Sequence, residues 1–252
     1  MARDLLNKIS SHMRTILFVS HLILLAFLGT SVSAQTLSEL LDQHALEMKA
    51  LRFDKDCGPI SFFNAMILAP KNLKKSILTL PGKTNDDRYR SLMRFYGTKP
   101  SRLNPSLPRY QSDLGISFQD LADMANDLIA GQNARFAMKA ASDSKSSFIT
   151  TLNDLNSSIT KGFAPVLALT FQSSDPSKTS VGHAVMLIQI MSVDETQKKA
   201  VLKILDPDGF NVTLMQVAQD SKGLLESSAQ GIWPADLPAG LMLLDSYIVL
   251  EN

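Results

Sequence analysis

The spacing of apolar residues divides the chain into a helical first half and a second half of short strands. In the first half, apolar residues recur every three or four positions, as on one face of an amphipathic helix. This spacing predicts helices at 36–51, 57–68, 86–96, 117–128 and 146–161, with a short helix or turn at 72–80.

In the second half, short apolar runs are bounded by turn residues, which is typical of buried strands. These runs predict strands at 165–171, 184–193, 200–205 and 246–250. Because helices precede strands, the pattern predicts an α+β fold in which a helical N-terminal half packs on an antiparallel sheet from the C-terminal half.

The segment 57–68 is apolar on nearly every side, which predicts a buried helix rather than a surface helix. Pro59 stands in its first turn, where a proline is tolerated because its missing N–H would have no helical partner. Cys57 therefore falls at the helix N-terminus, where the positive end of the helix dipole favours a thiolate. The alternative is that Cys57 is a small buried apolar residue, as free cysteines often are.

The first residues have the pattern of a secretory signal peptide. Arg3, Lys8 and Arg14 form a basic region before an apolar run at 15–30, and small residues lead up to Ala34. We therefore expect the segment before Gln35 to be removed and the protein to be exported, either to the periplasm or outside the cell. An uncleaved signal anchor is the alternative, although the apolar run is shorter than the roughly 20 residues of a membrane-spanning helix.

The predicted organisation is thus a signal peptide at 1–34 and one domain at 35–252, with a helical part at about 35–161 and a sheet part at about 162–252. The chain is 45% hydrophobic and 19% charged, as is typical of a globular protein. Its net charge of +1 gives no indication of a nucleic-acid partner, or of a membrane partner after signal cleavage. Neither a metal nor a cofactor is expected, because zinc-ligand spacing and a phosphate-binding glycine loop are both absent from the sequence.

Export changes the interpretation of Cys57, which is the single cysteine of the chain. Exported proteins usually use cysteines in pairs that form disulfides. A single cysteine has no internal partner, so its presence in an exported chain indicates a reactive thiol.

Two residues of the strand half are placed to act together. His183 begins one predicted strand and Asp206 ends the next, and these positions are neighbours when the two strands pair antiparallel. A free thiol with a pKa of about 8.5 is only a few per cent thiolate at pH 7, so it needs a base beside it. An imidazole takes the proton, and a carboxylate on the other ring nitrogen orients the imidazole. His44, at the edge of a helical apolar stripe, is more typical of a structural histidine.

Four short motifs occur in this order: Asp-Cys-Gly-Pro at 56–59, Lys-Gly-Phe-Ala-Pro-Val at 161–166, Gly-His-Ala-Val at 182–185 and Asp-Pro-Asp-Gly at 206–209. Together they resemble the motifs of papain-like cysteine peptidases, and most of all the bacteriocin-leader (double-glycine) peptidase-like group. The resemblance implies a papain-like fold and a peptide or protein substrate. It also implies the catalytic residues Cys57 as nucleophile, His183 as general base and Asp206 as orienting carboxylate.

One position departs from that pattern. Such enzymes carry a glutamine six residues before the cysteine as an oxyanion donor, and this chain has Leu51 there. Loss of one oxyanion donor costs about 3–4 kcal/mol, or 10²- to 10³-fold in rate. An inactive papain-like domain that binds peptides is therefore one alternative. An amidase or transpeptidase using the same triad, similar to phytochelatin synthases, is another, and a buried cysteine in an unrelated fold is the last.

Two segments rich in turn-forming residues, 97–115 and 172–181, are predicted to be irregular loops. They flank the proposed site, so they are expected to determine substrate specificity.

Overall fold

In the computed structural model, the described residues are 35–48, 56–141, 147–175, 177–229, 231–232 and 240–251. The range Thr36–Asn252 forms one compact unit. The predicted signal peptide at 1–34 and the departure at Leu51 lie outside the described residues.

The described helices begin close to the residues that the sequence indicates. Thr36, Ser117 and Ser147 each accept a hydrogen bond from the backbone of the first helical turn, which satisfies an N–H that has no helical partner. The helices are α2 (Leu37–His44), α3 (Cys57–Leu68), α4 (Lys71–Leu78), α5 (Asn85–Leu92), α6 (Phe118–Leu128) and α7 (Phe148–Thr160). A 3₁₀ turn (Ala45–Glu47) follows α2 and a π-helical turn (Met93–Gly97) follows α5, so both predicted helices end in a different helical geometry.

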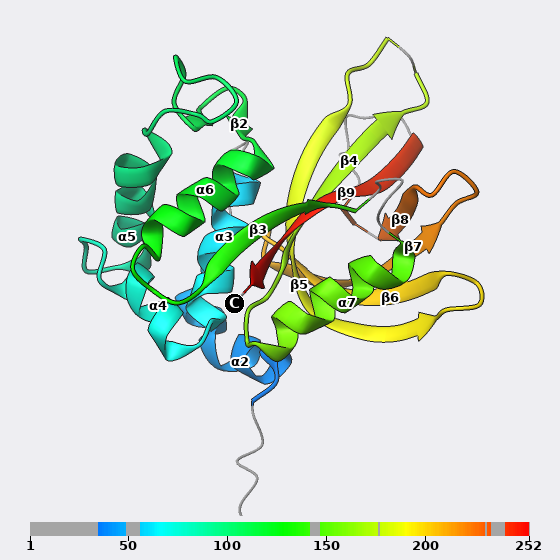
Figure 1. Ribbon diagram of the computed structural model, residues 1–252, viewed down its shortest axis with the longest axis horizontal. Helices are drawn as coiled ribbons and strands as arrows, with labels where there is room; N and C mark the ends of the chain where they lie inside the picture. The colour runs from blue at the N-terminus through cyan, green and yellow to red at the C-terminus, as the bar shows by residue number, and fades with distance from the viewer. Residues whose placement is uncertain are drawn as a thin grey trace, which may run out of the picture. The chain divides into compact units, whose positions relative to one another are not determined.

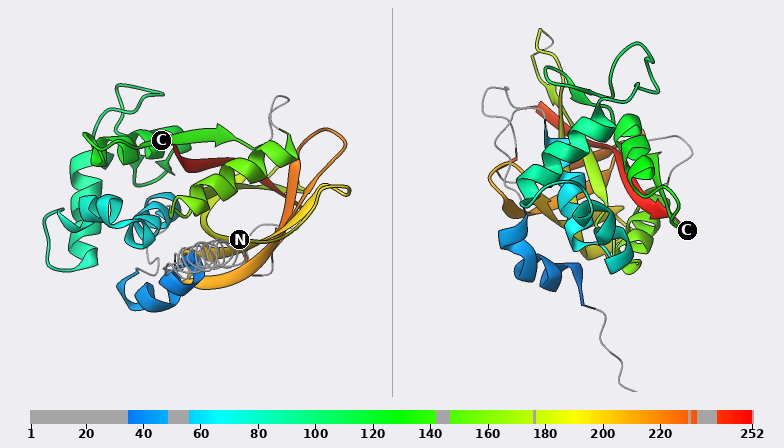
Figure 2. Two further views of the ribbon diagram at one scale, coloured as in Figure 1. Left: turned by 60° about the horizontal axis from the view of Figure 1, so that its bottom comes forward. Right: turned by 90° about the vertical axis from the view of Figure 1, so that its left-hand side faces the viewer.

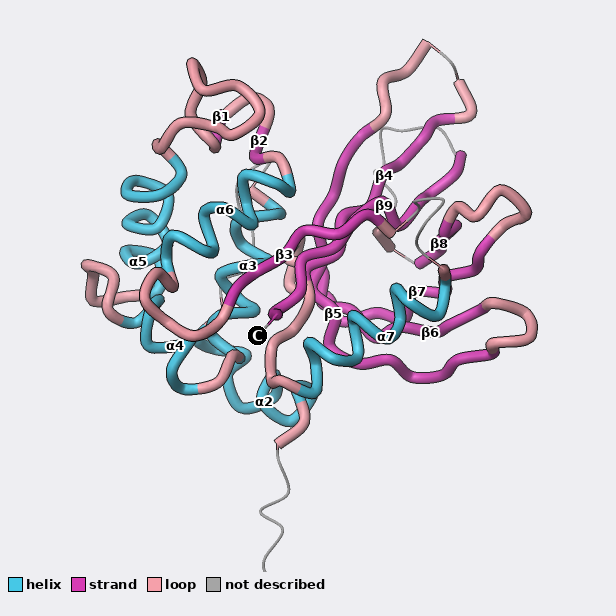
Figure 3. The backbone as a smooth tube through the Cα atoms, in the orientation of Figure 1, coloured by secondary structure: helices cyan, strands magenta, loops and turns pink. Residues whose placement is uncertain are grey.

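Strands of the described residues form a short hairpin and one large antiparallel sheet. The hairpin consists of β1 (Tyr110–Gln111) and β2 (Gly115–Ile116). The large sheet contains β3 (Arg135–Ala140), β4 (Val166–Ser173), β5 (Val181–Asp194), β6 (Lys199–Asp206), β7 (Asn211–Gln219), β8 (Leu225–Ala229) and β9 (Gly240–Glu251). Its strand order is β3-β9-β4-β5-β6-β7-β8, and β8 also pairs with β9 (Figure 3). Strands β4 to β9 therefore close into a six-stranded antiparallel barrel, and β3 extends the sheet beyond β9.

The α+β class with an antiparallel sheet is confirmed, but the sheet does not come from the C-terminal half alone. β3 lies between α6 and α7, within the part that was predicted to be helical, and pairs along its whole length with β9. The sequence pattern also missed β7 and β8, because only two residues of β7 and one of β8 are buried. The closure of the sheet was missed as well, since β8 and β9 pair across a stretch with no periodic pattern.

The core has two parts, which use opposite faces of the same strands. Val185 and Leu187 of β5 belong to the apolar cluster of the barrel interior, while Ala184 and Met186 belong to the cluster around α3. This alternation follows from the period of two along a strand. Helices α3 to α6 lie on one side of the barrel strands, and α7 lies apart from them (Figures 1 and 2).

Helix α3 is buried from Gly58 to Leu68, as its apolar sequence predicts. It packs against β5 and β4 on one side and against α2, α4 and α6 on the others. The helix that begins at Cys57 is therefore in direct contact with the strand that carries His183.

Candidate active site

One hydrogen bond fixes the start of α3 against β5. The hydroxyl of Ser61 donates to the carbonyl oxygen of Ala184 at 3.1 Å, and both residues are buried. Ser61 lies one helical turn after Cys57, and Ala184 directly follows His183. This bond therefore positions the thiol helix relative to the histidine strand.

His183 lies between Cys57 and Asp206. Its Nε2 is 2.9 Å from Oδ1 of Asp206, and the Cys57 thiol is close enough to the ring to help raise the pKa of His183. Because Asp206 occupies Nε2, Nδ1 is the ring nitrogen left for the thiol. The predicted pairing of His183 with Asp206 is thus confirmed, and His183 lines the same cleft as Cys57, whereas the catalytic roles of the three residues remain a proposal. His44 is instead paired with Glu47 at 3.0 Å, in agreement with its structural interpretation.

The turn after β6 holds the Asp206 carboxylate in place. Oδ1 of Asp206 also accepts a hydrogen bond from the backbone N–H of Asp208 at 2.9 Å. This local bond is typical of an aspartate that begins a turn. The Asp-Pro-Asp-Gly sequence therefore orients a buried carboxylate toward the His183 ring.

The environment of His183 favours the protonated ring. Burial, which includes packing against the ring of Phe171, by itself lowers the pKa of His183. The hydrogen bonds to Asp206 and Cys57 and the negative charge of these two groups outweigh burial and raise the pKa from 6.5 to about 10. An imidazolium beside the sulfur atom is the arrangement that makes a cysteine nucleophilic near neutral pH.

The residue before the cysteine has a role that the sequence did not indicate. An aspartate at this position typically caps the helix, but the side chain of Asp56 makes no such hydrogen bond. Its buried carboxylate instead accepts hydrogen bonds from the hydroxyls of Tyr89 and Tyr110. Burial and the negative charge of Asp56 raise the pKa of both tyrosines, so both phenols stay protonated as donors. The two tyrosines therefore anchor the chain directly before Cys57.

Cys57 and His183 line a cleft of about 870 Å³. Its walls include residues of both loops that were predicted to flank the site, among them Leu103 and Leu114 from the first loop and Thr179 and Ser180 from the second. Leu103 is 68% exposed and Leu114 is 72% exposed, which is unusual for leucine. The cleft thus has exposed apolar side chains at its rim and the polar residues Cys57 and His183 in its wall.

Helix α6 supports the first of these loops. The buried carboxylate of Asp120 accepts hydrogen bonds from the hydroxyl of Ser101 and the backbone N–H of Arg102, at 2.7 and 2.8 Å. Near the end of the same helix, Asp127 pairs with Arg109 at 2.7 Å and with Lys99 at 3.0 Å. These contacts attach the part of the loop between Lys99 and Arg109 to α6.

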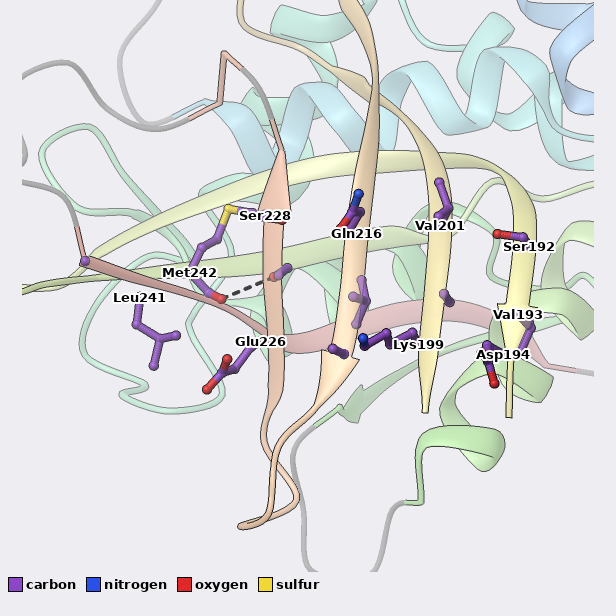
Figure 4. Close-up of a pocket in the computed structure, with 15 residues that line it drawn as sticks. Ser192, Val193, Asp194, Lys199, Val201, Gln216, Glu226, Ser228, Leu241 and Met242 are labelled. Atoms are coloured by element: carbon purple, nitrogen blue, oxygen red, sulfur yellow. Dashed lines mark hydrogen bonds between the residues drawn. The ribbon is translucent and has the colours of Figure 1, made fainter. Parts of the chain in front are cut away.

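A second cavity, of about 480 Å³, lies on strands β5 to β9 of the barrel. Figure 4 shows its lining side chains, which include Lys199, Gln216 and Glu226, and the hydrogen bond between the Ser227 hydroxyl and the Met242 carbonyl oxygen. Its described lining contains neither cysteine nor histidine and shares no residue with the cleft at Cys57. The residues that the sequence predicts to be catalytic therefore all lie outside this second cavity.

Comparison of the sequence with protein-family models and with curated proteins finds no match. The resemblance to papain-like cysteine peptidases therefore remains an expectation from the four sequence motifs. Among the described residues, no group of three or more His, Cys, Asp or Glu side chains is placed to hold a metal ion. None of the described helices combines the length and the apolar character needed to cross a membrane.

We expect Ser61→Ala to lower the free energy of unfolding by about 1 kcal/mol, because it removes a buried hydrogen bond between α3 and β5. Urea denaturation measures this loss. Ser91→Ala is the matched control, since Ser91 donates to the carbonyl oxygen of Pro81 at an exposed position. Equal losses in the two variants would show that the Ser61 bond does not stabilise the contact.

Proposed function

We propose that this protein is an exported papain-like thiol hydrolase that cleaves peptide bonds through Cys57, His183 and Asp206. The observation that carries the proposal is the position of His183, which lies between a thiol at a helix N-terminus and a buried carboxylate. This pair lies on the wall of a cleft large enough for several residues of an extended peptide.

The chemistry follows from the charges of the pair. The Cys57 thiolate attacks the carbonyl carbon of the peptide, and the carbonyl oxygen takes the negative charge. The His183 imidazolium gives its proton to the leaving amine, which leaves a thioester on Cys57. A water molecule then transfers a proton to His183 as it attacks the thioester, and the carboxylic acid and the thiolate are released.

The oxyanion needs donors close to Cys57. The backbone N–H of Cys57 lies in the first turn of α3, where the helix dipole adds positive charge. Gln119 is the one side-chain amide among the described residues of the cleft wall. Its Nε2 donates to Asp123 at 3.3 Å, so it becomes the second oxyanion donor only if the side chain turns toward the thiol.

An inactive peptide-binding domain is the second candidate function, and the leucine at position 51 favours it. The apolar rim formed by Leu103 and Leu114 would bind apolar peptide side chains in either case. An amidase or transpeptidase would use the same thioester, with an amine as the acceptor in the transpeptidase.

Incubation of the purified protein with a peptide library tests the proposal. We expect new peptide termini, detected by mass spectrometry, and we expect Cys57→Ala to abolish them because the nucleophile is removed. Products joined to an added amine would indicate a transpeptidase. Peptide binding without cleavage, equal in the natural protein and in Cys57→Ala, would support the binding domain instead.

A further inference from the structure

Strand β9 has an irregularity beside the cleft. Ala168 of β4 pairs with Ser246, but the next residue, Leu169, pairs with Leu244. Asp245 is therefore an extra residue in the ladder, a β-bulge. Bulges redirect side chains and are frequent next to active sites.

The bulge exposes a single residue of a buried strand. From Met242 to Leu250, every residue of the described strand β9 is buried except Asp245. The backbone carbonyl of Asp245 accepts a hydrogen bond from Ala141 at 2.8 Å, which ties the bulge to the end of β3. Asp245 lines the same cleft as Cys57 and His183, so the bulge places a carboxylate there.

No stabilising contact explains this carboxylate. Within the described part of the chain, the exposed Asp245 side chain has neither a hydrogen bond nor an ion pair. The described cleft lining contains one other carboxylate, Asp113, and neither lysine nor arginine. Within that described lining, the charge of Asp245 is therefore not balanced by a lysine or arginine side chain.

We propose that Asp245 is a specificity-determining residue that selects peptides with a lysine or arginine side chain next to the bond that is cleaved. The inference rests on the proposed function, and it names the substrate class of that site. An unpaired carboxylate on a cleft wall attracts a cationic side chain and disfavours an anionic one. The bulge fixes the carboxylate on a rigid strand, so little side-chain or loop ordering is needed when the peptide binds.

Peptide substrates that differ only in Lys, Leu or Glu at one position beside the cleaved bond test this selection. We expect the natural protein to prefer Lys, and we expect Asp245→Asn to lower the Lys-to-Leu ratio of kcat/KM about 10-fold, the effect of one close charge pair. Asp245→Lys should reverse the preference toward Glu. Glu226→Gln is the matched control, because Glu226 is an exposed acid on β8 that lies outside the cleft. A Lys-to-Leu ratio that Asp245→Asn leaves unchanged would overturn the inference.

A second measurement does not need turnover. Cys57 is the only cysteine of the chain, so its reaction with a cationic and an anionic methanethiosulfonate reagent of similar size reports the charge of the cleft. The thiolate forms a disulfide with the reagent sulfur, and a sulfinate leaves. We expect Asp245→Asn to lower the ratio of cationic to anionic rates several-fold, and Glu226→Gln to leave it unchanged.

The two measurements separate the inference from the proposed function. A lowered reagent ratio without any peptide cleavage would leave the cation selection of the cleft intact while the hydrolase proposal failed. Peptide cleavage with an unchanged reagent ratio would leave the hydrolase proposal intact and overturn the role of Asp245.

Discussion

We expect His183→Ala to slow the alkylation of Cys57 by iodoacetamide about 10- to 100-fold at pH 5. The natural protein holds a protonated imidazole beside the sulfur, because the pKa of His183 is raised to about 10. Without that partner, a thiol with a pKa of about 8.5 is only about 0.03% thiolate at pH 5. The alkylation rate of His183→Ala falls less than its thiolate fraction does, because a more basic thiolate is also a better nucleophile.

The pH profile of the alkylation rate is the clearest measurement. The natural protein should react well below pH 7, whereas His183→Ala should show an inflection near the pKa of a free thiol, about 8.5. His44→Ala is the matched control, because His44 is paired with Glu47 away from the thiol. Alkylation only above about pH 8, unchanged by His183→Ala, would contradict the ion pair and leave Cys57 as a packing residue.

Asp206→Asn should have a similarly large effect on peptide cleavage. We expect kcat to fall roughly 10³- to 10⁴-fold, as when the carboxylate that orients a catalytic histidine is replaced by an amide. The amide removes the negative charge that opposes the burial of His183, so the pKa of His183 should fall from about 10. Titration of the histidine ring signals by NMR measures that change.

The raised pKa of His183 also determines how the rate of peptide cleavage changes with pH. His183 has a raised pKa, so the imidazolium is present below about pH 10 and is lost as the pH rises through that value. The alkaline limb of kcat/KM should therefore lie near pH 10 and move to lower pH in Asp206→Asn. Asp208→Asn is the matched control, because the exposed Asp208 holds Asp206 through its backbone N–H alone. Equal effects of the two substitutions would contradict an orienting role for Asp206.

Alkylation and cleavage together distinguish the two candidate functions. Rapid alkylation at low pH without cleavage of any peptide would indicate an intact ion pair and an oxyanion site that lacks a donor. That outcome would connect the leucine at position 51 with an inactive peptide-binding domain. Rapid alkylation with cleavage would mean that another group, such as Gln119, supplies the donor.

The sequence by itself determined the local parts of the site. A largely apolar segment between Pro59 and Pro70 specifies a buried helix with Cys57 at its start. Two consecutive strand patterns joined by a polar turn specify the pairing of β5 and β6, which brings Asp206 to His183. Both features depend on residues that are close in the chain, where periodicity and turn chemistry act directly.

The tertiary structure decided everything that joins distant segments. The contact of α3 with β5 depends on packing and on the hydrogen bond between Ser61 and Ala184, which are 123 positions apart in the chain. Likewise, no periodic pattern in the sequence indicates the hydrogen bonds between Asp56 and its two tyrosines, the pairing of β8 with β9, or the bulge at Asp245. Such features arise when side chains from separate elements fit against one another, and a one-dimensional pattern does not record that fit.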